Sequence, residues 1–357
     1  MVTIQEVAER AGVSISTVSN VLNKKKYVSP QLKERVYQAV KELDYVADTV
    51  AKNMKRGYTK NIGVITSDMC GLFYPYVLQG IYQVLSQEGY HLTICDAHVE
   101  PGEKSLTKEQ EAFRSLFSNR VDGVIFVSSV SCREKAAYLE EILREAGRLK
   151  KTPLVSLERD FSAFGIDSVY YDNRKTAGLA VEHLIEKGCR KIAHIAGPKE
   201  EQIPEERQEG YLDTLDKHGM LSERRIVFGD YSHQSGYQAM MELLDTGDRP
   251  DGVYCANDQM AVGALKALKE RGIEIPEEIK IMGSDDVFVA SVVEPGISTV
   301  HIKKKSMGQR AAELLLMRIR ESEQDNAPVM AEEMDVHLVV RKSTDSQARD
   351  DWSVQDW

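Results

Sequence analysis

From residue 61 onward, short apolar runs alternate with longer segments that have the spacing of amphipathic helices. The runs are NIGVITS at 61, HLTICDA at 91, DGVIFVSS at 122, TPLVSLE at 152, SVYYD at 168, KIAHIAG at 191, RIVFGDY at 225, GVYCAN at 252 and KIMGSDD at 280. Strands that alternate with helices favour parallel sheets covered by helices on both faces. Because so many units exceed one comfortable sheet, we expect two doubly wound lobes. The first crossing between them is predicted near residues 166–168, and the run MDVHLVVRKST at 334 is expected to complete one lobe.

The composition permits a sizeable buried core. The chain has 357 residues, of which 42% are hydrophobic, so two or three domains are expected. It contains no apolar run long enough to span a bilayer and no secretory signal at its start, which predicts a cytoplasmic protein. The cysteines are scattered without a CxxC pair, so we expect reduced, structural thiols and neither a disulfide framework nor a metal site. They are Cys70, Cys95, Cys132, Cys189 and Cys255.

Charge is divided unevenly along the chain. The formal net charge is -10, yet residues 1–60 hold 11 Lys and Arg against 6 Asp and Glu, whereas the remainder holds 35 against 50. A basic N-terminal segment, called the head below, precedes an acidic remainder, called the body. This division indicates that only the head approaches a polyanion. Random scatter of surface charge is the alternative interpretation.

The head, residues 1–46, reads as three short helices. Thr3 and Glu6 fit a capping box, Gly12 breaks the first helical pattern, and Ser14 can cap the second helix. Ser29 followed by Pro30 predicts the start of the third. A glycine-containing turn between two short helices is typical of a helix-turn-helix, and residues 47–60 read as a polar, basic linker.

In a helix-turn-helix, the second helix lies in the major groove and its first residues meet base edges. Here the outward positions are Ile15, Ser16 and Asn20. Asn20 suits adenine, Ser16 can bond several bases, and Ile15 can contact a thymine methyl. Thr17, Ser19 and the run Lys24, Lys25 and Lys26 are placed to meet phosphates, although a solvated basic loop is the alternative for the lysines.

The segment TIQEVAERAGVSISTVSNVLN resembles the DNA-binding signature of the lactose-repressor/galactose-repressor (LacI/GalR) family of bacterial transcription regulators. Further matching stretches are DNRKTAGLAVEHLIEKGCRKIAHIAG (172–197), GDYSHQSGY (229–237), CANDQMAVGALKAL (255–268), GSDD (283–286) and HLVVRKST (337–344). The resemblance implies a homodimer on a pseudo-palindromic DNA operator, a hinge helix in the minor groove and a two-lobed body like the periplasmic sugar-binding proteins. The absence of a heptad of leucines at the end of the chain makes a dimer the default.

Several positions depart from the family pattern. Asn20 stands where the family usually has Arg, which favours adenine over guanine. In the hinge, Asp48 brings a negative charge close to phosphates, while Met54 can still serve as an apolar wedge. All residues expected to contact DNA are Thr3, Ser14, Ile15, Ser16, Thr17, Ser19, Asn20, Lys24, Lys25, Lys26, Ala51, Lys52, Met54 and Lys55.

An effector should bind at the carboxyl ends of the strands, between the lobes. Carboxylates, amides and a guanidinium beside an aromatic face suit the hydroxyls of a sugar. The resemblance assigns effector contacts to Ser67, Glu158, Arg207, Tyr231, Asn257 and Asp285, with Phe73 and Tyr74 at the mouth. Alternatively, Asn257 and Asp258 cap the following helix, and Tyr231 and Phe73 are core aromatics. Glu158 in place of the usual Asp, and Ser284 in place of an aromatic residue, leave the particular sugar open.

The predicted fold class is therefore α/β: an all-α helix-turn-helix head followed by two doubly wound parallel-sheet lobes. The hinge spans 47–60 and the effector-binding and dimerisation body spans 61–345, followed by a polar tail at 346–357. We place the first lobe at about 61–166 and 299–327 and the second at about 167–298 and 328–345. The expected function is transcriptional repression controlled by a small effector, with no cofactor and no catalysis, since hydrolase and nucleotide-binding motifs are absent. A solute-binding transport component and a nucleobase-responsive regulator are the alternatives, and His183, His194 and His301 are expected to face solvent or pack locally.

Overall fold

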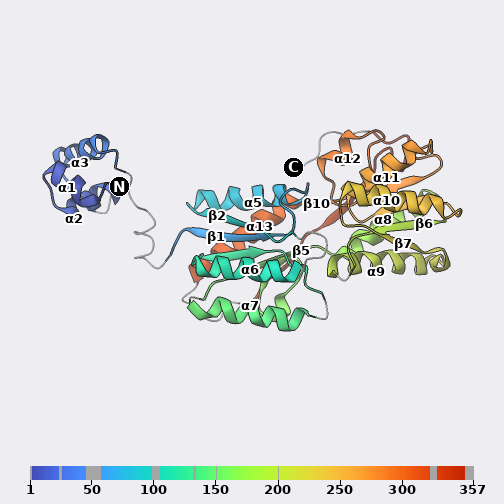
Figure 1. The fold of residues 1–357 in the computed structure, drawn as a ribbon, viewed down its shortest axis with the longest axis horizontal. Coiled ribbons are helices and arrows are strands. Elements are labelled where there is room, and N and C mark those ends of the chain that lie inside the picture. Colours follow the sequence, from blue (N-terminus) through green and yellow to red (C-terminus); the bar gives the residue numbers. More distant parts are fainter. Residues whose placement is uncertain are drawn as a thin grey trace. The chain divides into compact units, whose positions relative to one another are not determined.

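The computed structural model describes residues 2–23, 26–45, 58–98, 105–131, 134–149, 151–199, 201–321 and 328–349. The chain separates into two compact units, Met1–Thr59 and Lys60–Trp357 (Figure 1). The first unit contains the head and the second the body, and each is described by itself.

The head consists of α1 (Ile4–Ala11), α2 (Ile15–Asn23) and α3 (Pro30–Glu42). The predicted capping box is confirmed, because Thr3 and Glu6 each bond the other's backbone N–H. Gly12 ends α1 in the left-handed conformation, with φ of 63°, which a residue without Cβ adopts at little cost. Ser29 occupies the N-cap of α3, but its side chain makes no capping bond. Small apolar side chains from all three helices, with Val28 from the segment between α2 and α3, form one buried cluster: Val7, Ala8, Ala11, Val18, Val21, Val28, Val36 and Ala39.

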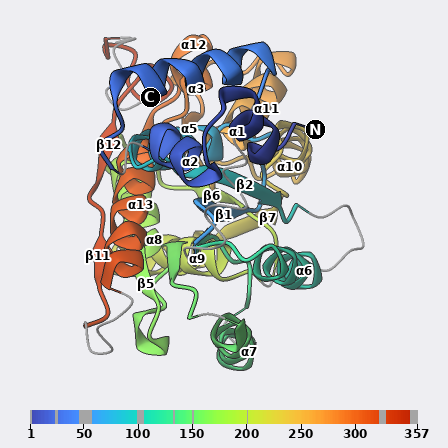
Figure 2. The same cartoon turned by 90° about the vertical axis from the view of Figure 1, so that its left-hand side faces the viewer.

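The first lobe of the body is built on a six-stranded sheet in the order β11-β5-β4-β3-β1-β2, and all its pairs are parallel. Helices α5 and α13 lie on one face and α6 and α7 on the other (Figure 1, Figure 2). The strands are β1 (Asn61–Thr66), β2 (His91–Asp96), β3 (Gly123–Phe126), β4 (Leu154–Glu158), β5 (Asp167–Tyr170) and β11 (Ala331–Glu333). The helices are α5 (Tyr74–Gln87), α6 (Ser105–Ser118), α7 (Lys135–Leu149), the short 3₁₀ helix η1 (Ser162–Phe164) and α13 (Lys304–Glu321).

The second lobe has a parallel four-stranded sheet in the order β7-β6-β8-β9. Helices α8 and α9 pack together, as do α10 and α11. The strands are β6 (Ile192–Ala196), β7 (Arg225–Phe228), β8 (Gly252–Cys255) and β9 (Lys280–Met282). The helices are α8 (Asn173–Glu186), α9 (Gln202–Lys217), η2 (Leu221–Glu223), α10 (His233–Asp245), α11 (Asp258–Glu270) and α12 (Phe288–Val292). The predicted α/β fold class with a helical head is thus confirmed.

The predicted lobe boundaries are wrong at two places. β5 pairs with β4 in the first sheet, so the first crossing follows Tyr170 instead of falling near 166–168. β11, at 331–333, also joins the first sheet, although this region was expected in the second lobe. The late run forms β12 (Val336–Val339), which pairs antiparallel with β10 (Thr299–Ile302) and not with a strand of either lobe sheet. Single bridges and backbone hydrogen bonds join this two-stranded ribbon to the end of β9, so the late run borders the second lobe as an appended ribbon.

Further expectations concern the histidines, the cysteines, membrane-spanning helices and metal sites. His183, His194 and His301 are all buried, so of the two alternatives expected for them, solvent exposure and packing inside the protein, the structure shows packing. Cys70, Cys95, Cys189 and Cys255 are free thiols, while Cys132 lies outside the described residues. Among the described residues, no helix is long and apolar enough to cross a membrane. The same residues hold no cluster of three or more His, Cys, Asp or Glu suited to a metal ion.

Candidate functional sites

The start of α2 presents a polar surface on the head. Ser14, Ile15 and Ser16 are exposed, and the Ser14 hydroxyl lies 2.7 Å from that of Ser16 and 2.9 Å from that of Thr17. Ser14 also accepts a bond of 3.1 Å from the Thr17 N–H, which confirms it as the cap of α2. Because each hydroxyl can both donate and accept, this cluster can rearrange onto phosphate or base acceptors.

The other residues expected to contact DNA differ in their exposure and in the hydrogen bonds that their side chains make. Asn20 is half-buried and its amide makes no hydrogen bond within the described residues. The Ser19 hydroxyl accepts from the Asn23 amide at 3.2 Å, and Lys26 is exposed. Thr3 is exposed, and its hydroxyl bonds Glu6. Lys24, Lys25, Ala51, Lys52, Met54 and Lys55, together with Asp48, lie outside the described residues.

In the body, polar side chains from both lobes meet where the strands end. The Ser67 hydroxyl, just after β1, lies 2.9 Å from that of Tyr74 at the start of α5. Tyr74 donates to Glu158, the last residue of β4, at 2.5 Å, and Tyr171 donates to the other oxygen of Glu158 at 3.0 Å. Tyr74 therefore reaches the interior of the site, whereas the sequence placed it at the mouth.

Arg207 of α9 continues this chain of contacts into the second lobe. It donates to the Tyr171 hydroxyl at 3.1 Å and to the Asp285 carboxylate at 3.4 Å. Its Nε bonds the Asn173 side chain at 3.0 Å. Its remaining nitrogen donates to the Ala256 carbonyl. A continuous hydrogen-bonded path thus connects Ser67 in one lobe with Asp285 in the other.

Burial shapes the electrostatics of this network. Glu158 and Asp285 are only 6% and 8% exposed. Desolvation raises the pKa of both carboxyl groups, partly offset at Glu158 by the tyrosine hydroxyls and at Asp285 by the charge of Arg207. Hydrogen bonds from tyrosine hydroxyls and the charge of one guanidinium therefore offset part of the free-energy cost of burying these two acids.

Backbone strain is concentrated at the same strand ends. Glu158, Tyr231 and Asp285 have φ of 64°, 69° and 99°, in the left-handed region that favours glycine. Such conformations cost of order 1–3 kcal/mol each and persist only where the surroundings determine them. Their coincidence at three of the predicted effector residues marks these strand ends as a functional region.

The remaining effector candidates occupy the same region. Asn257 accepts from the Met260 N–H at 2.9 Å and donates to the Tyr231 carbonyl at 3.0 Å, so its alternative role as the cap of α11 is confirmed. Asp258 is not the cap: its carboxylate accepts from the Val287 N–H and from Thr299, both away from the start of α11. Phe73 and Tyr231 are half-buried, and Phe73 packs edge-on against the Tyr74 ring with centroids 5.3 Å apart.

Sequence reasoning missed several residues of the network. Tyr171 and Asn173 hold Arg207 in place, and Gln259 accepts from the Leu72 N–H at 3.2 Å, which joins the two lobes at the rim. Tyr171 directly follows β5, so the expectation that effector contacts lie at the carboxyl ends of the strands could have pointed to it if the end of β5 had been predicted at Tyr170. Nothing in the spacing of Gln259 signals its contact across the cleft.

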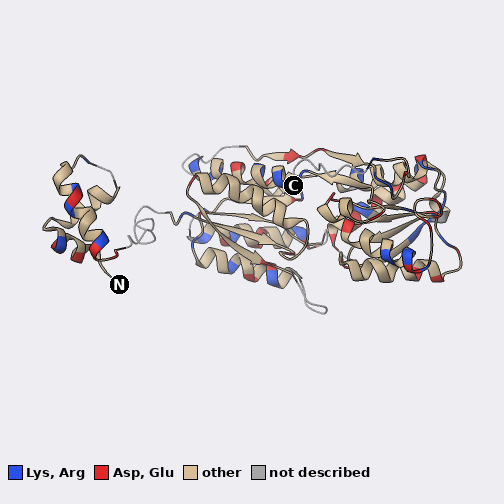
Figure 3. Cartoon of the chain, turned by 90° about the horizontal axis from the view of Figure 1, so that it is seen from above, with Lys and Arg blue, Asp and Glu red and all other residues tan. Residues whose placement is uncertain are grey.

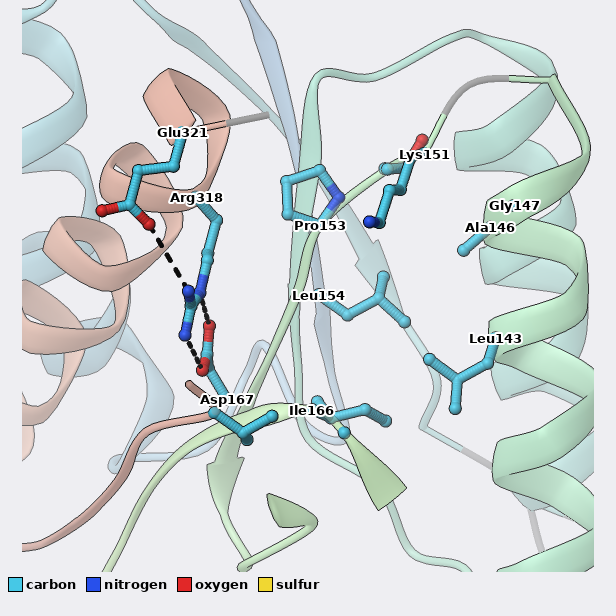
Figure 4. Close-up of a pocket in the computed structure, with 13 residues that line it drawn as sticks. Leu143, Ala146, Gly147, Lys151, Pro153, Leu154, Ile166, Asp167, Arg318 and Glu321 are labelled. Atoms are coloured by element: carbon cyan, nitrogen blue, oxygen red, sulfur yellow. Dashed lines mark hydrogen bonds and ion pairs between the residues drawn. The ribbon is translucent and has the colours of Figure 1, made fainter. Parts of the chain in front are cut away.

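A separate pocket of about 570 Å³ lies at the opposite end of the first lobe, where β4 and β5 begin (Figure 4). Leu143, Leu154 and Ile166 line it, beside a two-pronged ion pair in which Arg318 bonds Asp167 at 2.6 and 2.8 Å. Asp167 also accepts from a backbone N–H. Because its acid and guanidinium satisfy each other, this pocket has less capacity to recognise a polar effector than the strand ends do.

Comparison with known proteins agrees with this geometry. Residues 3–48 match the family described as bacterial regulatory proteins, lacI family, and residues 181–344 match the periplasmic binding protein-like domain. The chain is 33% identical over 347 residues to the HTH-type transcriptional repressor PurR of Proteus mirabilis, covering 96% of this chain and 97% of that protein.

Solved structures give the same result. The lac repressor dimer bound to operator and the anti-inducer ONPF superposes with a TM-score of 0.83 at 28% identity, covering 96% of this chain and 99% of that one. The transcriptional regulator CelR in complex with cellobiose has a TM-score of 0.67 at 30% identity and covers 96% and 100%. The chain therefore belongs to the lacI family of bacterial regulatory proteins and is a DNA-binding transcriptional repressor.

Proposed function

We propose that this repressor is a cytoplasmic homodimer whose affinity for a pseudo-palindromic operator is controlled by a sugar or sugar derivative bound between its two lobes. The observation that carries the proposal is the hydrogen-bonded path from Ser67 through Tyr74, Glu158 and Tyr171 to Arg207 and Asp285. A ligand that replaces any of these bonds changes how tightly the lobes are held together. The path therefore offers a physical link between ligand binding and lobe geometry.

The chemistry of the strand ends suits hydroxyl groups. Asp285 and Glu158 accept hydrogen bonds, Arg207 and Asn257 donate them, and Phe73 offers an apolar face. The relative CelR was solved with cellobiose, which favours a sugar over a nucleobase for a chain of similar fold. The proposed effector contacts are Ser67, Phe73, Tyr74, Glu158, Arg207, Tyr231, Asn257 and Asp285.

On the head, we assign base reading to the first residues of α2. Ile15 is 46% exposed and can cover a thymine methyl, while the unbonded Asn20 amide can pair with adenine N6 and N7. Two copies of this helix on a two-fold axis would read half-sites about one helical turn apart. The lac repressor relative was solved as a dimer on its operator, which supports this arrangement. The hinge at 47–60, with Met54 as the wedge, would couple the head to the body.

The experiment that tests the proposal is selection of bound duplexes from a randomised DNA pool by the full-length protein at near-physiological salt. Enrichment of a palindrome is expected, with adenine at the position that Asn20 reads. Titration of sugars should then change operator affinity, and linkage requires operator to change sugar affinity by the same factor. A folded protein that enriches no duplex, with or without cell extract, would refute the proposal.

A further inference from the structure

The edge where the strands of the body end carries far more acid than base. Among the residues at, or up to three residues after, the last residue of a strand of the two lobe sheets, carboxylates outnumber cations. The acids are Asp68, Asp96, Glu158, Asp160, Asp172, Asp230, Asp258, Asp285, Glu333 and Asp335; the bases are Arg159 and Lys199, joined by Arg207 from α9 and Lys304 from α13. Elsewhere on the body, charges of both signs are interspersed (Figure 3). Parallel strands end on one edge of their sheet, so these acids share one electrostatic environment.

The cations at this edge are already engaged by protein groups. Each nitrogen of the Arg207 guanidinium donates to a protein acceptor, and Arg207 is only 3% exposed. Arg159 donates to the Ser128 carbonyl at 2.7 Å and to Gln202, and it stacks on the Phe161 ring at 4.8 Å. Lys199 lies over the Phe228 ring at 4.5 Å. An incoming anion would have to displace these contacts.

The backbone offers little compensation. At the start of α5, which points its first turn toward Glu158, the Leu72 N–H already donates to Gln259 and Pro75 has no N–H. At the start of α11, Asn257 caps the Met260 N–H. The Asp258 N–H is also engaged, by the Ser284 carbonyl at 2.9 Å. These two helix ends therefore offer fewer open N–H groups to a phosphate than uncapped helices would.

The two innermost acids, Glu158 and Asp285, determine which ligand charge the site disfavours. Glu158 takes its two side-chain hydrogen bonds from tyrosine hydroxyls, and Asp285 shares Arg207 at 3.4 Å. The buried Lys304 ammonium also lies here and donates to the backbone carbonyls of Asp285 and Asp286, at 2.5 and 3.1 Å. Because both cations are fully engaged by protein acceptors, two buried carboxylates give a site that disfavours a further anion and accepts hydroxyl groups. Hydroxyls can donate to the carboxylate oxygens without bringing any charge.

Building on the proposed function, we infer that the site between the lobes selects an uncharged polyhydroxylated ligand and rejects the phosphate monoester of the same ligand. The inference narrows the effector from sugars and their derivatives to neutral sugars. It concerns ligand binding alone and stands whether or not the ligand changes operator affinity.

Isothermal titration calorimetry of the full-length protein without DNA tests the inference. The ligands are cellobiose, D-ribose, D-glucose and D-galactose, with cellobiose 6′-phosphate, D-ribose 5-phosphate, D-glucose 6-phosphate and D-galactose 1-phosphate as matched esters. Adenine serves as a neutral ligand without hydroxyls. We expect one neutral sugar to bind once per chain and its ester to bind at least about a hundredfold more weakly, because juxtaposed like charges are strongly unfavourable. An ester that binds as tightly as its parent overturns the inference. Binding of adenine alone, or of no neutral sugar, overturns it as well.

A charge variant separates electrostatic rejection from a poor steric fit. In the Asp285→Asn variant, the affinity for the sugar divided by the affinity for its ester should be about tenfold smaller than in the wild type. Glu158→Gln provides the same comparison if Asp285→Asn binds nothing. Asp245→Asn removes one negative charge at the last residue of α10, where its partner is Arg271, and should leave the ratio unchanged. Equal ratios in the wild type and in both cleft variants would overturn the role of the acids.

Failure of this inference and failure of the proposed function give different results. Tight ester binding that changes operator affinity refutes the inference and leaves the regulated repressor intact. A neutral sugar that binds without changing operator affinity supports the inference and refutes control by that sugar.

Discussion

At the scale of single residues, Arg207 is the side chain on which most of the effector network depends. We expect Arg207→Met to lower the free energy of unfolding by about 3–5 kcal/mol, because it leaves Asp285 buried without its cation. The variant should also lose any response of operator affinity to sugar. Urea unfolding of the full chain, monitored by circular dichroism, measures the first effect.

Arg174→Met is the matched control for that prediction. The Arg174 side chain is 54% exposed and pairs with Asp213 and Glu209 on the surface, so its loss should cost less than about 1 kcal/mol. Equal destabilisation by both substitutions would contradict the claim that burial of the Asp285 pair matters.

His194 makes stability depend on pH. The side chain is fully buried in β6, stacked on Tyr254 with ring centroids 4.7 Å apart, and desolvation lowers its pKa from 6.5 to about 4. Below pH 6.5 the unfolded chain binds a proton that the folded chain does not, so this residue's contribution to stability is lost as pH falls toward 4. Between pH 7 and pH 5 the expected loss is about 2 kcal/mol.

The comparison that isolates this effect is His194→Phe, which keeps an aromatic ring beside Tyr254 and removes the titrating group. Urea unfolding at pH 7 and pH 5 should show a drop in stability that is about 2 kcal/mol smaller in the variant than in the wild type. An identical drop in both proteins would show that other groups account for the acid sensitivity.

At the scale of elements, glycines at two positions should respond to alanine in opposite directions. At Gly12 the backbone is left-handed and a Cβ would lie 2.4 Å from a nitrogen of Arg35, so Gly12→Ala should destabilise the head by about 1 kcal/mol or more. At Gly147, inside α7, a Cβ would meet open space, so Gly147→Ala should stabilise that helix by about 0.5–1 kcal/mol.

Amide hydrogen exchange of the full-length protein measures both substitutions locally. Gly12→Ala should speed exchange across α1 and α2, while Gly147→Ala should slow it across α7. Slower exchange in the head of Gly12→Ala would mean that the turn between α1 and α2 does not need its left-handed residue.

At the scale of the whole molecule, binding to DNA should follow the basic character of the head. Operator affinity should fall steeply with salt, because each phosphate contact releases counterions. Lys26→Ala should reduce the slope of log affinity against log salt by about 1, since Lys26 is exposed beside α2. Lys217→Ala, a lysine of the body with 69% side-chain exposure, should leave the slope unchanged. Fluorescence anisotropy with the selected operator across a salt series makes this measurement, and equal slopes for all three proteins would rule out phosphate contact by Lys26.

Local patterns in the sequence determined the elements and their class. The capping box at Thr3 and Glu6, the break at Gly12 and the alternation of apolar runs with helical segments each depend on contacts within a few residues, so the sequence predicted them correctly. The rule that ligands meet the carboxyl ends of parallel strands also placed Glu158 and Asp285 in one region, and the family resemblance added Arg207 to it.

Only the tertiary structure decided which sheet each strand joins and which side chains satisfy one another. β5 and β11 enter the first sheet because parallel strands pair across long separations in sequence, such as Ala331 with Ser168, and no local pattern encodes such a choice. The roles of Tyr171 and Gln259 depend on partners in the other lobe. Periodicity in the sequence records which face of an element is buried, whereas the partner of a buried polar group is fixed by where distant segments meet in space.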